Sequence, residues 1–375
     1  MNLAHSSGNT ATLLVPGYRG SFLVTQGPKP ERAWITAGQA LVRGNRSLAL
    51  PFPGRRPEPT YGPLRPDGPM TRVGVLFASV DAYGACLRHF PGLVPFGYDW
   101  RQDVRRSAGE LRARIEQLVA EGGGEREINI VAHSMGGLVT LYCLLHGGEG
   151  GGPWSGAKHV RRVAIVGTPF NGSAAAFDDL LLGTQTVRNR GLLTSDTLFT
   201  FPAVFQLLPP RGDFLVDASG APVKWDAFNP AVWREKGWGP FRDASLREDE
   251  SYRSQLERML QAHRELDEAL RPTSPPPPPP FETLVVVGSG QPTPSGFQEK
   301  NGTLDVEHPL NGDGDGSVVS SRALPLLPMA YRRVDSKSEH VALMSDKKVL
   351  VAIERFLRGE TVGVGGAGGR AGEGG

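Results

Sequence analysis

A serine framed by small residues stands between a short apolar run and an apolar helical pattern. The stretch from Ile128 to Leu138 reads INIVAHSMGGL, with Ala132, Ser134 and Gly136 in a small-x-Ser-x-small frame. A strand-to-helix turn tight enough to expose a hydroxyl leaves no room for bulky side chains at the two flanking positions. The hydroxyl then lies at a helix N-terminus, where free N–H groups favour developing negative charge. Ser134 is therefore predicted to be a nucleophile, with an ordinary serine N-cap as the alternative.

A nucleophilic serine needs a base, and the base needs a carboxylate that orients it. For a serine on such a turn, the carboxylate and then the histidine are expected on loops after later strands. His340 follows the last predicted strand and precedes the final predicted helix, so it is the predicted base. His308, near Asp305 and Asp313, is the main rival. His133 is a poor candidate, because successive side chains around the turn point apart.

The carboxylate that orients the histidine is expected in the loop 311–318, NGDGDGSV, which follows the penultimate predicted strand. Asp313 and Asp315 are both candidates, and Asp305 is a weaker third. A plain Gly/Asp turn is one alternative. Calcium is another, since the Asn, both Asp and the following Gly match positions one, three, five and six of an EF-hand loop. Arg322 stands at the twelfth position, where that loop needs a Glu, which argues against calcium.

Acyl-transfer chemistry also needs two backbone N–H groups that bind the oxyanion. One is expected from Met135, directly after the serine. The other is expected from the loop after an early strand, where Gly17 lets the backbone approach closely. The Tyr18 amide is therefore the second candidate, and an ordinary turn at Pro16-Gly17 is the alternative reading.

Composition narrows the classes of function. The 41 basic and 39 acidic residues give a formal charge of +2, which argues against nucleic acid or an anionic membrane surface as the main partner. The two cysteines, Cys86 and Cys143, lie apart in apolar, helix-like stretches, so neither a disulfide framework nor a cysteine zinc site is expected. The chain has no HExxH motif and no phosphate-cradling loop, so no metal or cofactor is predicted.

Targeting signals are also not evident. The first twenty residues have neither a basic n-region nor a long apolar run, and no stretch approaches eighteen apolar residues. A soluble, cytoplasmic protein without an integral membrane segment is the resulting expectation. The sequence does not indicate an oligomeric state.

Short apolar runs alternate with longer helical patterns, which is typical of a parallel sheet with crossover helices. Strands are predicted at Thr12–Val15, Val73–Phe77, Leu93–Tyr98, Ile128–Ala132, Val163–Gly167, Leu284–Val287 and Tyr331–Val334. Helices are predicted at Ala82–Phe90, Ala108–Ala120, Gly136–His146, Glu248–Leu270 and Lys347–Arg358.

Two regions interrupt this alternation. Residues 28–70 are rich in Pro, Arg and Gly and are predicted to run over the surface. Residues 174–280 hold an aromatic stretch, a charged helix and six prolines, which indicates an inserted cap that packs on the core and ends in an extended spacer. A ligand for a proline-recognition domain is the alternative for the proline run. The predicted organisation is a core in two parts, residues 1–173 and 281–358, the cap 174–280, and a disordered Gly-rich tail 359–375.

Taken together, these motifs resemble the lecithin:cholesterol acyltransferase family of α/β-hydrolases, which includes lysosomal phospholipases and phospholipid:diacylglycerol acyltransferases. The similarity covers roughly residues 10–358 and keeps the family's order. The matching stretches are Val15–Gly17 (VPG), Tyr98–Arg101 (YDWR), Ala132–Gly137 (AHSMGG), Gly167–Ser173 (GTPFNGS), Gly288–Pro294 (GSGQPTP), Gly312–Val318 (GDGDGSV) and Ser338–His340 (SEH).

The resemblance implies an α/β-hydrolase fold with a mostly parallel central sheet and a cap, or lid, over an acyl pocket. It implies Ser134 as nucleophile, His340 as base and Tyr18 as second oxyanion amide. The acid falls on the Asp before Gly-Ser-Val, which is Asp315 rather than Asp313. The expected function is a serine-dependent acyl-ester hydrolase or O-acyltransferase acting on lipid esters. A non-catalytic module of the same fold that binds a lipid or a partner is the alternative.

Overall fold

The computed structural model describes residues 9–36, 48–54, 61–71, 73–75, 78–150, 152, 154–186, 189–210, 214–271, 279–327 and 329–362. The predicted spacer is described only at Pro279 and Pro280, so most of it lies outside the described residues, and so does most of the predicted tail.

A six-stranded sheet forms the centre of the fold, in the order β16-β13-β9-β8-β1-β7, with every neighbouring pair parallel. Chain order and sheet order agree except at one place: the chain passes from β1 to β7 on one side, and then returns to β8 on the other. Six of the predicted strands are thereby confirmed. Their bounds are β1 Thr10–Val15, β7 Leu93–Pro95, β8 Glu127–His133, β9 Val160–Val166, β13 Glu282–Gly288 and β16 Arg332–Ser336.

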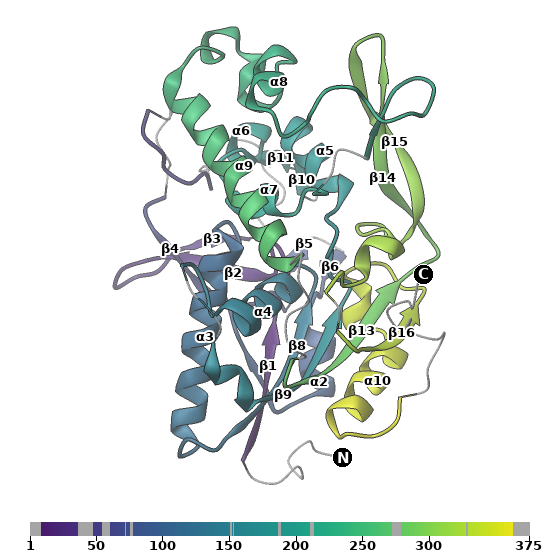
Figure 1. Cartoon of the computed structure of the whole chain (residues 1–375). Coiled ribbons are helices and arrows are strands. Elements are labelled where there is room, and N and C mark those ends of the chain that lie inside the picture. Colours follow the sequence, from purple (N-terminus) through teal and green to yellow (C-terminus); the bar gives the residue numbers. More distant parts are fainter. Residues whose placement is uncertain are drawn as a thin grey trace.

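Helices cover both faces of this sheet (Figure 1). Successive strand residues point to opposite faces, so Leu13 and Val15 of β1 pack with helices α3 and α4. Leu14 instead packs with α2 and α10. These four helices and a fifth, α9, confirm the predicted helical patterns, with bounds α2 Gly84–His89, α3 Val104–Glu121, α4 Met135–His146, α9 Glu250–Leu270 and α10 Lys347–Leu357.

The elements of the predicted cap lie beyond the carboxyl ends of the strands (Figure 1). Their aromatic side chains pack on one another: the rings of Phe205 and Trp233 stack at 5.5 Å, and Phe177 meets Trp238 edge-on at 5.2 Å. This cluster is continuous with the core under α3 and α4. The further elements here are α5 Ala174–Leu182, β10 Thr184–Thr186, β11 Asn189–Leu193, α6 Ser195–Leu198, α7 Pro202–Gln206, β12 Leu215–Val216 and α8 Pro230–Glu235, with 3₁₀ turns at Gly239–Arg242 and Ala244–Leu246.

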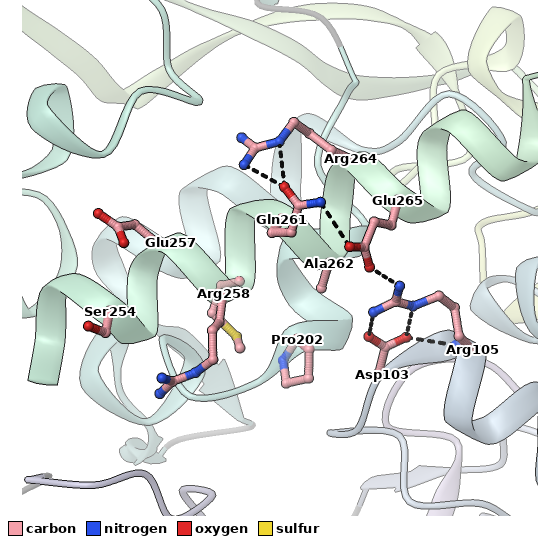
Figure 2. A pocket seen from close by; sticks show the side chains of 11 residues that line it. Asp103, Arg105, Pro202, Ser254, Glu257, Arg258, Gln261, Ala262, Arg264 and Glu265 are labelled. Carbon is pink, nitrogen blue, oxygen red and sulfur yellow. Dashed lines mark hydrogen bonds and ion pairs between the residues drawn. The ribbon is translucent and has the colours of Figure 1, made fainter. Parts of the chain in front are cut away.

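A polar contact joins α9 and α7 to the start of α3 (Figure 2). Arg105 pairs with Asp103 at 2.7 Å and also with Glu265 of α9. Gln206, which is buried at the end of α7, accepts a hydrogen bond from the Val104 amide and donates to Asp103. The predicted cap and the core are therefore bonded to each other on this side.

Two of the smaller sheets, each of three strands, were not predicted. In one, β14 (Gln291–Lys300) and β15 (Thr303–Gly314) form a long antiparallel hairpin, and β12 pairs parallel with β14. In the other, β2 (Ser21–Thr25) lies between β3 (Arg32–Trp34) and β4 (Leu64–Pro69). The expectation that residues 28–70 only run over the surface is thus wrong in part, since strands that pair with distant segments need no local periodicity.

The strand predicted at Val73–Phe77 is wrong as a member of the central sheet. Residues 73–75 form β5, which pairs antiparallel with β6 (Ala78–Val80). An apolar run of this length suits a buried parallel strand, but here residues 78–80 are its pairing partner. Shorter 3₁₀ turns elsewhere span Ser155–His159, Ser320–Ala323 and Ala342–Met344. No helix in the described part of the chain combines the length and hydropathy needed to cross a membrane.

Side chains of the YDWR stretch, residues 98–101, make buried polar contacts beside β1. Arg101 makes a bidentate ion pair with Asp99, at 2.7 and 2.8 Å, and donates to the Leu48 carbonyl at 2.8 Å. Trp100 donates to the Ser21 carbonyl. Both charged side chains are almost completely buried, so neither can find water if its partner is removed.

Replacing Arg101 by Met should therefore leave a buried, uncompensated carboxylate and lower the free energy of unfolding by about 3–5 kcal/mol. The matched control is Arg106→Met, which removes an exposed pair with Glu110 and should cost no more than about 0.5 kcal/mol. Urea denaturation of both variants measures the two losses. Equal losses would show that the buried ion pair contributes no more to the free energy of unfolding than the exposed one.

Candidate active site

The turn after β8 holds Ser134 in a backbone conformation that side chains rarely adopt, with φ at 55° and ψ at −129°. The Ser134 amide donates to the Val166 carbonyl at 2.8 Å, and the Thr168 hydroxyl donates to the Ser134 carbonyl at 2.7 Å. Gly136 is required by a close approach, because a Cβ there would lie 2.4 Å from the Val15 carbonyl oxygen. Hydrogen bonds from β9 and its loop thus hold the strained turn in place.

The structure brings together Ser134, His340 and Asp315, which come from three separate loops. The Ser134 Oγ lies 2.8 Å from His340 Nε2, and His340 Nδ1 lies 2.7 Å from Asp315 Oδ2. A carboxylate only accepts hydrogen bonds, so Nδ1 carries the proton and Nε2 is free to accept from the serine hydroxyl. This is the arrangement that lets an imidazole take a proton from a hydroxyl.

The surroundings of Asp315 favour its charged form. Burial raises the pKa of the carboxyl, but hydrogen bonds from His340, Val318 and Ser317 outweigh burial and hold that pKa below its usual range. The amides of Ser317 and Val318 donate to Oδ1 at 2.9 and 2.7 Å, while Oδ2 faces the imidazole. Asp315 is therefore an anion that is hydrogen-bonded to the His340 imidazole.

The β14–β15 hairpin explains how Asp315 reaches this position. It leaves the end of β13 and returns to the same place, because Gln291 at its start pairs with Gly314 at its end. Asp315 follows directly, and its main-chain carbonyl accepts from the His340 amide at 2.8 Å. The acid is thus located beside the end of β13, although many residues separate the two in the chain.

The two predicted oxyanion amides lie at the meeting point of β1 and β8. Within the described residues, no acceptor is bonded to the amides of Tyr18 or Met135. Gly17 lies so close to Ser134 that a Cβ on it would be 2.7 Å from the serine Cβ and 3.2 Å from Oγ. The loop that carries the Tyr18 amide thus packs against Ser134.

The rival candidates lie elsewhere. His308 bonds Asp305 on the exposed hairpin, and Asp313 accepts from the Gly290 amide and the Ser320 hydroxyl. The loop that resembled a calcium site is instead strand β15 with the acid after it. No group of three or more His, Cys, Asp or Glu in the described ranges is arranged to hold a metal ion.

A pocket of about 740 Å³ lies away from these residues, along α9 and the start of α3 (Figure 2). Its lining alternates acidic and basic side chains, among them Arg105, Glu257 and Arg258. The ion pairs described above occupy part of this lining. The pocket is therefore part of the contact between the predicted cap and the core, and the Ser134 cluster is the candidate site.

Sequence reasoning gave His133 no part in the site, yet the structure gives it a defined position. Its Nδ1 lies 2.8 Å from the Tyr83 hydroxyl, and its Nε2 lies 3.0 Å from the His340 carbonyl. Burial and the adjacent His340 lower the pKa of His133 to about 3, so the ring is neutral. His133 does not reach the serine hydroxyl, as predicted, but it does contact the backbone of the predicted base.

A parallel sheet covered by helices on both faces, with a serine on a strained turn after a central strand, defines an α/β-hydrolase. A chain of the Tle4–Tli4 complex shares this fold, with a TM-score of 0.55 at 13% identity over 91% of this chain and 96% of that chain. The predicted fold class is confirmed.

Residues 91–232 match the family model described as lecithin:cholesterol acyltransferase. Over these residues, the resemblance seen in the motifs to this family is confirmed. An uncharacterized protein of Saccharomyces cerevisiae is 27% identical over 251 residues, which are 65% of this chain and 36% of that protein. The lysosomal phospholipase A and acyltransferase of Homo sapiens is 23% identical over 282 residues, or 70% and 61%. The chain thus spans about a third to three fifths of these relatives.

The neutral state of His133 predicts a pH dependence of stability. Because its pKa is lowered from 6.5 to about 3, the unfolded chain binds a proton that the folded chain does not, and stability falls as the pH falls through this window. Between pH 7 and pH 5, wild type should lose about 2 kcal/mol of unfolding free energy more than His133→Gln, which lacks the titrating ring.

Urea denaturation at pH 7, 6 and 5 measures this difference. Other titrating groups, including the buried His263, are present in both proteins and cancel. His308→Gln, which removes an exposed ring, should follow wild type. Parallel pH profiles for wild type and His133→Gln would contradict a neutral, buried His133.

Proposed function

We propose that this protein is a serine-dependent acyl-ester hydrolase or O-acyltransferase that acts on lipid esters through an acyl-enzyme intermediate. The observation that carries the proposal is the continuous hydrogen-bonded chain from Asp315 through His340 to the Ser134 hydroxyl. A non-catalytic lipid- or partner-binding module would not require these three groups to be aligned.

In the proposed reaction, Ser134 Oγ attacks the ester carbonyl while His340 Nε2 takes its proton. Asp315 holds the imidazole in the correct tautomer and stabilises the imidazolium. The amides of Met135 and Tyr18 bind the oxyanion, each contributing about 3 kcal/mol to lowering the barrier. His340 then returns the proton to the leaving alcohol, and an acyl-serine remains.

The second half of the reaction repeats these roles with a new nucleophile. Water or an acceptor alcohol gives its proton to His340 and attacks the acyl-serine. His340 then returns a proton to Ser134 Oγ as the Oγ–acyl bond breaks, and an acid or a new ester is released. The small exposure of the site supports acyl transfer as well as hydrolysis: Ser134 is 9% exposed, and excluding water favours the alcohol.

Relatives support a lipid ester as substrate. The human relative is named as a phospholipase and acyltransferase, and an Arabidopsis thaliana protein named as a phospholipase A(1) is 34% identical over 99 residues, which are 25% of this chain and 21% of that protein. The segment 174–280 is proposed to act as the cap over the acyl chain. The cytoplasmic location and the exclusion of nucleic acid as partner stay predictions from the sequence.

Removal of the Ser134 hydroxyl by Ser134→Ala should lower turnover about a millionfold. Hydrolysis of p-nitrophenyl esters from acetate to palmitate, with and without detergent, measures the effect for wild type and variant side by side. Wild type but not Ser134→Ala should also be labelled by a fluorophosphonate. Activity on short chains alone would overturn the lipid substrate, and absence of both turnover and labelling would favour the binding module.

Replacing each carboxylate by an amide distinguishes Asp315 from Asp313 as the residue that orients His340. Asp315→Asn should lower kcat about 10⁴-fold, because an amide there would hold His340 in the wrong tautomer. Asp313→Asn, the matched control two residues earlier, should stay within about threefold of wild type, since in the described part of the chain its carboxylate accepts from the Gly290 amide and the Ser320 hydroxyl, away from His340. The same ester assay gives both values. A larger loss of kcat in Asp313→Asn than in Asp315→Asn would instead indicate Asp313 as the catalytic carboxylate.

A further inference from the structure

Both polar atoms of one peptide group, the one that joins Pro16 to Gly17, are bound by buried tyrosines. The Tyr98 hydroxyl donates to the Pro16 carbonyl at 2.7 Å. The Gly17 amide donates to the Tyr83 hydroxyl at 2.8 Å. Tyr83 and Tyr98 come from different parts of the chain and are 2% and 0% exposed, so water cannot replace either hydrogen bond.

The hydrogen bonds continue from Tyr83 to the predicted base. Tyr83 Oη already accepts from the Gly17 amide, so its own hydrogen is directed to Nδ1 of His133, 2.8 Å away. The neutral imidazole then carries its proton on Nε2 and donates to the His340 carbonyl at 3.0 Å. A backbone donor at one end and a backbone acceptor at the other end fix the direction of the whole chain.

We infer that Tyr83, Tyr98 and His133 are positioning residues, which set the orientation of the Tyr18 amide relative to Ser134 and His340. This inference rests on the proposed function. None of the three reaches the serine hydroxyl, and they act through the backbone of the loop 16–18 and of His340. We call Tyr83, Tyr98 and His133 together the tyrosine clamp.

The peptide geometry explains why this clamp bears on the oxyanion. The next peptide group has its carbonyl on Gly17, which accepts from the Gly20 amide at 2.9 Å. Its N–H, that of Tyr18, points the opposite way because the peptide is trans and planar. With the preceding peptide held by two tyrosines and Gly17 packed against Ser134, the Tyr18 amide has little freedom to turn.

Loss of one hydroxyl should therefore affect the transition state more than substrate binding. Tyr83→Phe and Tyr98→Phe should each lower kcat about 10–100-fold with KM within about twofold, since an oxyanion donor that is slightly misplaced loses much of its contribution. The double variant should lose less than the product of the two single effects, because both hydroxyls hold one peptide. The p-nitrophenyl ester that wild type hydrolyses fastest is the probe.

Tyr331→Phe is the matched control. Tyr331 packs on the small cluster around Val285 and Val287, before β16 begins, and its variant should keep wild-type kcat and KM. Thermal unfolding of all four variants identifies any general loss of folding. If the two clamp variants fold and match Tyr331→Phe in kcat, the inference is overturned.

A second readout does not depend on activity. The imidazole ¹⁵N resonances of His133, assigned by their loss in His133→Gln, should report the neutral Nε2–H tautomer from pH 5 to pH 8. In Tyr83→Phe the Nδ1 resonance should move, because it loses its O–H donor. An Nδ1–H tautomer, or protonation near the ordinary pKa, would overturn the clamp even in an active enzyme. If wild type lacks Ser134-dependent turnover, the proposed function fails and this readout alone decides the clamp.

Discussion

The site depends on the one place where chain order and sheet order diverge. β1 and β8 are neighbours, but the chain leaves β1 toward one side of the sheet and leaves β8 toward the other. In open α/β sheets, ligands generally bind at such a switch point, beyond the carboxyl ends of the strands. Gly17 and Tyr18 follow β1, and Ser134 follows β8, so the serine and its proposed oxyanion amides meet there as a result of topology.

Burial has opposite consequences for the two ionisable groups nearest this point. Asp315 is 1% exposed but accepts three hydrogen bonds, so it keeps its charge in a place where an unpaired carboxylate would lose it. His133 is also buried, but its two ring nitrogens are hydrogen-bonded to a hydroxyl and a carbonyl, which are uncharged. Its ring therefore remains neutral. The two side chains beside His340 thus have fixed charges, one negative and one neutral.

Sequence reasoning succeeded where short segments determine structure by themselves. The turn around Ser134 is specified by small neighbours, and the six central strands by apolar runs separated by helical patterns. It failed where partners are distant in the chain. The pairing of β2 with β4, the β14–β15 hairpin and the contacts of His133 with Tyr83 each join segments whose local composition gives no sign of the other. The choice of Asp315 over Asp313 came from resemblance to a family, since spacing alone left both open.

The β14–β15 hairpin brings residues that are far apart in the chain, Gln291 and Gly314, next to each other in space. Its two strands begin and end at the same place, so Asp315 stands where it would stand if the hairpin were much shorter. Residues near its tip, such as Asn301 and Gly302, can therefore change in number or kind without displacing the carboxylate. This makes the hairpin a surface on which the chain can gain or lose contacts with its surroundings while the geometry around Ser134 is preserved.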